Sequence, residues 1–312
     1  MQRGGKVGVI GVGNLGSCIA YELANRGLAD EIVLVDIVRD IAEGNAADIG
    51  QALAFRNNTK VYAGDYSDID DSQIVIVAAG KPRTPEMKSR LELLEVNRKI
   101  MGEVAKGIKD LSGEPVIVTL TNPVDVMNYL LWKYTGFPRE KVIGSAGMLD
   151  SARFRCVLSR RYNVPVLDVE AYVIGEHGEK QVPVFSKVKI RNMRVEFKDA
   201  EKSEIINELK QAALAVISKK GATVYAPANN TANMVEAILK DEKKTCICSA
   251  ILNGEYGLTG LSIGVPVVLG KGGVEAIIEW ELSEDEKEAF YSGAESIRRA
   301  IESITEQTAK NF

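Results

Sequence analysis

Several features that mark particular classes of protein are scarce in this chain of 312 residues. The formal net charge is -4, so the chain has no basic excess to neutralise a nucleic-acid backbone, and we expect no nucleic acid as a partner. No apolar run approaches the roughly 18 residues needed to cross a bilayer. A strand-like run already begins at Lys6, so we expect neither a membrane span nor a secretory signal.

Cysteine and histidine are scarce as well. Two of the four cysteines, Cys246 and Cys248, are separated by one residue, which is the wrong spacing for a C-x-x-C redox or zinc pair. We therefore expect reduced thiols, no metal site and a cytoplasmic protein. His177 is the only histidine, so imidazole proton chemistry near neutral pH has to use this residue.

The composition is that of a globular protein, with 46% hydrophobic and 26% charged residues. In the first half, short β-branched runs alternate with helical patterns, and Leu94, Met101 and Ile108 belong to one apolar helix face. The runs predict strands over residues 7–10, 32–36, 74–78, 116–119 and 142–144. Continuous apolar strands between helices predict a parallel sheet that is covered on both faces.

A glycine motif, G-x-G-x-x-G, lies at residues 11–16, directly after the first predicted strand and before a helical pattern. Its glycines allow a tight turn and the close approach of a pyrophosphate, to which the helix N-terminus offers free N–H groups. Asp36 ends the second predicted strand, where a carboxylate binds a ribose diol; the alternative is a simple turn residue. The pattern predicts a dinucleotide site formed by Gly11, Val12, Gly13, Asn14, Leu15, Gly16 and Asp36.

The same carboxylate bears on the choice between the two nicotinamide dinucleotides. Asp36 favours NAD over NADP, because it would repel a 2′-phosphate. Arg39 is close enough in the sequence to soften that repulsion, so a weaker use of NADP stays open.

The second half of the sequence has more polar alternation. It predicts strands over residues 169–174, 182–188, 193–197 and 263–269, and helices over 200–220 and 283–308. Gly221 is expected to end the first of these helices. We therefore predict an α/β fold: a Rossmann doubly wound parallel sheet over residues 1–145, followed by an α/β (α+β) substrate-binding domain over residues 146–312.

His177 is the first candidate for catalysis. A lone histidine is more often structural, but Gly175 and Gly178 flank this one closely, and glycines allow a ligand to approach. An acid/base histidine needs a partner that fixes its tautomer. Asp150 is the best candidate for that partner.

Four groups of residues occur in the order found in the L-lactate/L-malate dehydrogenase superfamily. They are the glycine motif with Asp36, Thr-Asn-Pro-Val-Asp at 121–125, Leu-Asp-Ser-Ala-Arg-Phe-Arg at 149–155 and Gly-Glu-His-Gly at 175–178. The chain resembles this family over nearly its whole length, and is most similar to the lactate-dehydrogenase-like branch of the malate enzymes. The resemblance implies that His177 is the acid/base catalyst and Asp150 its hydrogen-bonded partner.

The resemblance also implies which residues bind substrate and cofactor. Arg153 is expected to hold the C1 carboxylate of the substrate as a two-pronged ion pair, and Arg90 to polarise the reacting carbonyl from a mobile loop. Hydride arriving at a keto carbon leaves negative charge on the oxygen, which needs a proton donor and a fixed cation beside it. Asn122 is expected beside the nicotinamide, followed by a cis bond to Pro123. Further cofactor contacts are implied for Asn97, Leu120, Thr121 and Asn122.

The choice of substrate depends on Arg83, in the segment over residues 79–90. In the family, the position that matches Arg83 usually carries Arg in malate enzymes and Gln in lactate enzymes. A buried arginine pairs with the second carboxylate of oxaloacetate, whereas pyruvate leaves it unpaired, at roughly 3–5 kcal/mol. The alternative is that Arg83 only decorates a solvated loop. Glu86 and Lys88 also depart from the family's usual loop pattern.

Together these features predict an NAD-dependent L-malate dehydrogenase that interconverts malate and oxaloacetate, as in the tricarboxylic acid cycle. The partner is then a small dicarboxylic 2-hydroxy or 2-keto acid. The nearest alternative is an L-lactate or other 2-hydroxy-acid dehydrogenase with the same catalytic residues. A remote alternative is a non-catalytic NAD-binding protein. The resemblance also implies a homo-oligomer, with a tetramer favoured over a dimer.

Overall fold

The computed structural model describes residues 5–82 and 90–310. Apolar runs form the strands, and segments with one apolar face form the helices that cover them. The elements of the first half are β1 (Lys6–Ile10), α1 (Asn14–Asn25), β2 (Glu31–Val35), α2 (Arg39–Leu53), β3 (Lys60–Ala63), β4 (Ile74–Val77), α3 (Arg90–Ile108), β5 (Val116–Thr119), α4 (Val124–Thr135) and β6 (Val142–Gly144).

The second half is longer in helices and shorter in most of its strands. Its elements are α5 (Gly147–Tyr162), β7 (Val169–Glu170), β8 (Val173–Gly175), β9 (Gln181–Pro183), β10 (Lys189–Ile190), β11 (Met193–Arg194), α6 (Asp199–Lys220), α7 (Tyr225–Leu239), β12 (Lys244–Asn253), β13 (Thr259–Gly270), β14 (Gly273–Ile277) and α8 (Glu284–Lys310). No helix among the described residues has both the length and the apolar character that a bilayer crossing requires.

The first six strands form the parallel sheet that the sequence predicts. Their order is β3-β2-β1-β4-β5-β6, and Val7 of β1 pairs with Ile32 on one side and Ile74 on the other. Nearly every residue of β1, β2, β4, β5 and β6 is buried, because helices cover both faces. This order is the Rossmann arrangement, so the predicted fold class is confirmed.

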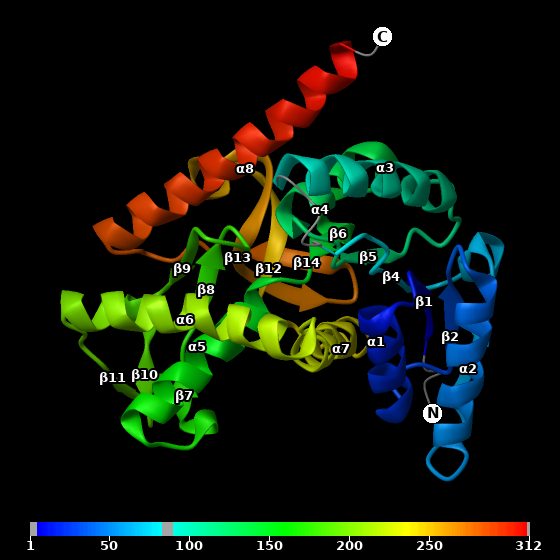
Figure 1. Cartoon of the computed structure of the whole chain (residues 1–312), viewed down its shortest axis with the longest axis horizontal. Helices are drawn as coiled ribbons and strands as arrows, with labels where there is room; N and C mark the ends of the chain where they lie inside the picture. Colours follow the sequence, from blue (N-terminus) through cyan, green and yellow to red (C-terminus); the bar gives the residue numbers. More distant parts are fainter. Residues whose placement is uncertain (1–4, 83–89, 311–312) are drawn as a thin grey trace.

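The sheet continues into the second half of the chain. Ser249 of β12 pairs antiparallel with Gly144 of β6, and β13, β8 and β9 follow, with β14 beside β13, to give an 11-stranded sheet in the described part of the chain. A small separate sheet has the order β11-β10-β7. Helices α3, α4 and α8 lie on one face of the large sheet, and α1, α5 and α7 lie on the other (Figure 1).

Some predicted strands of the second half have different bounds. The run over 169–174 is two strands, β7 and β8, and the run over 182–188 leaves the sheet after Pro183 to form a short 3-10 helix, Phe185–Lys187. Strand β11 ends at Arg194. The two long helices lie where the sequence predicts them, and Gly221 follows α6 at a positive φ of 85°.

The ends of the parallel strands position the candidate site. The carboxyl ends of parallel strands meet at one edge of a sheet, so five strand-to-helix connections converge there. They begin after β1 at Gly11, after β2 at Asp36, after β4 at Ala78, after β5 at Leu120 and after β6 at Ser145.

Candidate active site

The glycine loop is shaped by two close contacts and one open face. Gly11 has a φ of 88°, and a Cβ atom there would lie 2.4 Å from the backbone nitrogen of Ala79. A Cβ atom on Gly16 would lie 1.9 Å from the carbonyl oxygen of Gly11. Gly13, in contrast, has open space where its Cβ would be. The loop is thus closed against β4 and α1 but open above Gly13, which fits a pyrophosphate beside the α1 N-terminus.

The neighbouring residues of the motif complete this cradle. Asn14 begins α1, Val12 is buried, and Leu15 packs against the core. Asp36 accepts hydrogen bonds from the backbone N–H of Val12 at 2.7 Å and of Val38 at 2.9 Å. The carboxylate therefore fixes the glycine loop to the end of β2, a function that the sequence analysis did not assign to it.

Arg39 does not point its charge at Asp36. Its guanidinium is paired with Glu43 at 2.8 Å and Asp65 at 3.5 Å. Among the described residues, the ion pairs of Arg39 are thus with acids other than Asp36, so its charge is partly neutralised before it could offset the carboxylate of Asp36.

Asn97 links the connections that follow β4 and β5. Its side chain is 1% exposed, and its amide donates to the carbonyl oxygens of Lys81 at 3.1 Å and Asn122 at 2.7 Å and accepts from the N–H of Lys81 at 2.8 Å. Both amide hydrogens are thus used within the protein. Asn97 holds the two connections together rather than presenting its amide outward.

The residues after β5 lie at the same edge. Leu120 and Thr121 are buried, and the hydroxyl of Thr121 donates to the carbonyl oxygen of Ala79 at 2.6 Å. Asn122 is exposed, and its bond to Pro123 is cis, as the sequence predicts. The exposed side chain of Asn122 therefore follows directly from a buried strand end.

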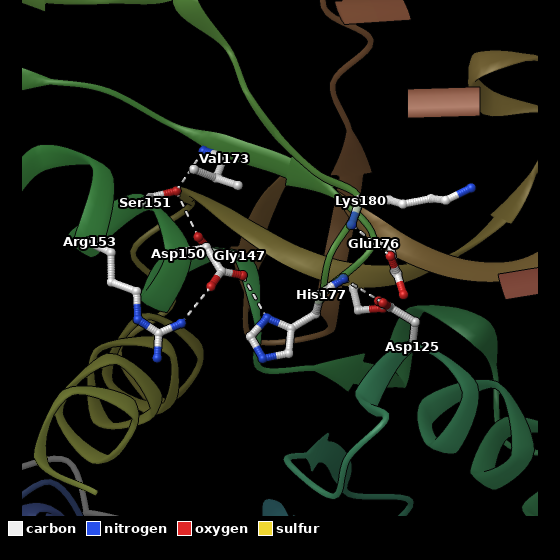
Figure 2. Close-up of polar contacts among 10 residues, drawn as sticks. Asp125, Gly147, Asp150, Ser151, Arg153, Val173, Glu176, His177 and Lys180 are labelled. Atoms are coloured by element: carbon white, nitrogen blue, oxygen red, sulfur yellow. Dashed lines mark hydrogen bonds and ion pairs between the residues drawn. The ribbon is translucent and has the colours of Figure 1, made fainter. Parts of the chain in front are cut away.

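His177 and Asp150 are in direct contact (Figure 2). His177 follows β8, and its Nδ1 lies 2.6 Å from Oδ2 of Asp150, in the first turn of α5. Asp150 is only 4% exposed. A carboxylate accepts here, so Nδ1 carries the hydrogen and Nε2, which points away from Asp150 in Figure 2, is the nitrogen that can exchange a proton.

The surroundings raise the pKa of His177 above its ordinary value. Burial alone would lower this pKa, but the charge of Asp150 and its hydrogen bond outweigh burial. The charge of Asp125 raises the pKa further, and that of Arg153 opposes the increase. The imidazole therefore keeps its proton to a higher pH than a free histidine.

Arg153 lies one turn along α5 from Asp150. Its Nη1 donates to Oδ1 of Asp150 at 2.9 Å, so one carboxylate contacts both the imidazole and the guanidinium (Figure 2). Within the described residues, this is the one hydrogen bond that Arg153 donates. Its other guanidinium nitrogens are therefore available to bind a further group, and a carboxylate matches their planar geometry.

Asp125 is a site residue that the sequence analysis missed. It lies in the first turn of α4 and is 3% exposed, and its Oδ2 accepts the backbone N–H of His177 at 2.8 Å. Burial raises the pKa of Asp125 to about 6, although hydrogen bonds from Ser249 and from the His177 backbone favour the ionised form. The available signal was its position directly after Asn-Pro-Val, at the start of a helix.

Two predicted site residues lie wholly or partly outside the described part of the chain. Arg83 lies outside the described residues. Arg90 is the first residue of α3, and its side chain lies outside the described part of the chain. The described residues therefore bring together His177, Asp150 and Arg153, and Asn122 lies two residues before α4, the helix that carries Asp125.

The chain matches two known domain families over nearly its whole length. A profile of the lactate/malate dehydrogenase NAD-binding domain matches residues 5–144, and one of the lactate/malate dehydrogenase alpha/beta C-terminal domain matches residues 147–308. The chain is 43% identical over 303 residues to a malate dehydrogenase of Natronomonas pharaonis, covering 96% of this chain and 99% of that relative.

Lactate dehydrogenases are similar to a comparable extent. The chain is 38% identical over 313 residues to L-lactate dehydrogenase 1 of Clostridium acetobutylicum, covering 97% of this chain and 100% of the relative. The crystal structure of Cryptosporidium parvum malate dehydrogenase superposes with a TM-score of 0.92 at 36% identity, covering 98% of this chain and 100% of that one.

Proposed function

Because the chain belongs to the lactate/malate dehydrogenase family, we propose that it is an NAD-dependent L-malate dehydrogenase, which interconverts malate and oxaloacetate. At the level of the family, it is an oxidoreductase that uses NAD(H) on a small hydroxy or keto acid. The observation that carries the proposed chemistry is the contact of one buried carboxylate, Asp150, with both His177 and Arg153.

His177 is the proton donor and acceptor of the proposed reaction. In the reductive direction, the developing alkoxide takes the proton from Nε2; in the oxidative direction, Nε2 takes the proton from the hydroxyl group. Asp150 holds the ring through Nδ1 and stabilises the imidazolium. The raised pKa of His177 suits a group that must carry a proton near neutral pH.

Arg153 and Arg90 bind the substrate in this proposal. Arg153 pairs with the C1 carboxylate, since planar guanidinium groups bind carboxylates through two parallel hydrogen bonds. Arg90 is expected to lie beside the reacting oxygen, where a fixed cation stabilises developing negative charge. Asn122, which is exposed three residues after β5, is expected to hydrogen-bond the substrate.

The open face above Gly13, the α1 N-terminus and Asp36 fit an NAD molecule. When bound, its nicotinamide supplies or accepts the hydride. Asp36 favours NAD over NADP, since a ribose diol can donate to its carboxylate whereas a 2′-phosphate would be repelled. The pairing of Arg39 with two acids supports that preference.

Arg83 is the basis for malate rather than lactate as the substrate. A guanidinium in the pocket pairs with the second carboxylate of oxaloacetate, and pyruvate has no group to pair with it. The 43% identity to a malate dehydrogenase supports this choice, while the 38% identity to a lactate dehydrogenase is the observation that favours the second candidate, L-lactate.

The test is the ratio of kcat/KM for oxaloacetate and pyruvate with NADH, repeated with NADPH. We expect oxaloacetate and NADH to be preferred, and Arg83→Gln to lower the ratio of oxaloacetate to pyruvate by about 100-fold. A preference of the unaltered chain for pyruvate would instead identify a lactate dehydrogenase. Binding of NADH without turnover of any 2-keto acid would identify a non-catalytic NAD-binding protein.

The proposal extends to assembly, domain limits and location. We propose a homo-oligomer, with a tetramer favoured over a dimer, and exposed apolar side chains on α1, α6 and α7, namely Tyr21, Leu214, Ile217 and Tyr225, support self-association. A mass in solution equal to that of one chain would contradict it.

We further propose that the domains meet near residue 145, and that the chain works in the cytoplasm, where its four free thiols stay reduced.

A further inference from the structure

Asp125 is an ionisable group in a place where burial opposes its charge. The carboxylate is 3% exposed in the first turn of α4. Its Oδ2 accepts the His177 backbone N–H at 2.8 Å, and its Oδ1 accepts the hydroxyl of Ser249, on β12, at 2.5 Å. The two oxygens thus join the histidine loop to the middle of the sheet.

A buried hydrogen-bonded chain continues from Ser249. Its hydroxyl lies 2.8 Å from that of Ser262 on β13, and Ser262 in turn accepts from Nδ2 of Asn128 on α4 at 2.9 Å. All three side chains are fully buried. The position of Asp125 is therefore fixed from β12, β13 and α4 together.

The histidine loop depends on anchors outside itself. Gly175, with a φ of 86°, and Gly178 flank His177. Hydrogen bonds within the loop run from the N–H groups of Gly178 and Lys180 to Glu176, whereas both hydrogen bonds of His177 go to residues outside the loop. Asp150 holds the imidazole ring and Asp125 holds the main chain of the same residue. Figure 2 shows these two carboxylates on opposite sides of His177.

On the basis of the function proposed for His177, we infer that Asp125 is a positioning residue that anchors the histidine backbone and, through its negative charge, favours the protonated imidazole. Asp150 and Asp125 then act on different parts of the same residue, since Asp150 aligns the ring and Asp125 fixes the loop from which the ring projects.

The hydrogen bonds of Asp125 alone do not explain why a charged residue occupies this position. An asparagine could accept the His177 N–H and engage Ser249 through the other half of its amide, without the penalty of burying a charge. The charged groups that face this region are Asp150 and Arg153 from α5, Asp125 from α4 and Glu176 from the loop itself. Among them, Asp125 adds negative charge near the imidazole in opposition to Arg153.

The first experiment reads the protonation of His177 directly. Because the chain has one histidine, tag-free protein labelled in histidine gives one imidazole signal to follow by NMR against pH. We expect Asp125→Asn to lower the pKa of His177, and Ser262→Ala, which alters the buried chain without touching Asp125 or His177, to leave it unchanged. An unchanged pKa in Asp125→Asn would overturn the inference.

A second variant covers the case in which Asp125→Asn does not fold. Ser249→Ala removes a hydrogen bond that favours the ionised form of Asp125, so the carboxylate keeps its proton to a higher pH and supports the imidazolium less. The pKa of His177 should again fall. If this pKa stays unchanged in Ser249→Ala, the charge of Asp125 does not act on the imidazole.

The second experiment separates charge from anchoring, by the pH dependence of keto-acid reduction. Asp125→Asn keeps an acceptor for the His177 N–H, so its kcat should match the unaltered chain at acidic pH and fall earlier as the pH rises. Asp125→Ala also frees the loop, and its kcat should be lower at every pH, by about 100-fold, with KM little changed. Equal kcat profiles for the two variants would rule out anchoring.

The two readouts also separate this inference from the proposed function. A lowered pKa of His177 in a chain that reduces no keto acid would leave the coupling between Asp125 and His177 intact and remove its catalytic role. Turnover with an unchanged pKa in Asp125→Asn would leave the proposed function intact and overturn the inference.

Discussion

Single side chains at this site serve two neighbours at once. Asp150 contacts the ring nitrogen of His177 and a guanidinium nitrogen of Arg153. The same carboxylate therefore holds the expected proton donor and the group that is expected to bind the substrate. A change at Asp150 should therefore affect proton transfer and substrate alignment together.

Replacement of Asp150 by Asn should shift the pH dependence of reduction. A histidine whose pKa is raised delivers its proton at and below that pKa, and the reductive rate falls as the pH rises through it. Without the Asp150 charge, the pKa of His177 should drop, so that the fall begins at a lower pH, and kcat should decrease by about 100-fold or more. Rate profiles from pH 5 to 9 measure this, with the remote Asp168→Asn as control; an unmoved profile would remove Asp150 from its role.

Asp125 makes a second prediction, about stability. A carboxyl whose pKa rises from 3.8 to about 6 on folding binds its proton more tightly when folded, so the chain loses stability as the pH rises from about 4 through about 6. Asp125→Asn lacks this loss. Its free energy of unfolding in urea at pH 7.5 should exceed that of the unaltered chain by up to about 3 kcal/mol, and the difference should vanish at pH 4. An equal gain at both pH values would show another cause.

At the scale of elements, the glycine loop and α1 depend on three glycines in different ways. Gly11 and Gly16 are required by contacts inside the protein, whereas Gly13 leaves room above the loop. Packing and the proposed cofactor binding can therefore be tested separately within one motif.

Alanine substitutions at Gly13 and Gly16 should have contrasting effects. Gly16→Ala places a methyl group 1.9 Å from a carbonyl oxygen, so α1 must shift and the free energy of unfolding should fall by about 1–3 kcal/mol. Gly13→Ala should retain the stability of the unaltered chain and raise the Kd for NADH, because its methyl occupies open space over the loop. Urea unfolding and NADH fluorescence titration measure the two effects. Tight NADH binding by Gly13→Ala would place the pyrophosphate elsewhere.

The sequence predicts the parallel half of the fold better than the antiparallel half. Strands β1, β2, β4, β5 and β6 are buried on both faces and read as apolar runs, whereas β3 at the sheet edge has a partly exposed pattern. Strand β12 was not predicted, because its residues Cys246 and Cys248 were interpreted only through their spacing, as a possible redox or metal pair, and not as apolar strand residues. Both are buried free thiols that pack as small apolar residues.

The site divides along similar lines. The contact between His177 and Asp150 could be predicted because both carry recognisable chemistry within motifs. The anchoring by Asp125 could not, because it joins a carboxylate to a backbone N–H 52 residues away, and a backbone group leaves no mark in the sequence. The hydrogen bonds by which Asn97 joins the connections after β4 and β5 could not be predicted either, because their partners are also backbone groups.

At the scale of the whole molecule, one sheet runs through both halves of the chain. The pairing of Gly144 with Ser249 joins the parallel strands to the antiparallel ones, and a Cβ atom on Gly144 would lie 2.7 Å from that of Ser249. The glycine loop and the histidine loop are therefore attached to one continuous sheet rather than to two bodies joined by a linker.

Because β6 and β12 pair directly through Gly144 and Ser249, the two halves of the chain should unfold as one cooperative unit. Each half carries one tryptophan, Trp132 or Trp280, so Trp132→Phe and Trp280→Phe yield a fluorescent reporter for either half. Both reporters should give the same denaturation midpoint. Gly144→Val places a branched side chain between β6 and β12, so the two denaturation midpoints should differ in this variant. Coincident midpoints would mean that other contacts couple the two halves.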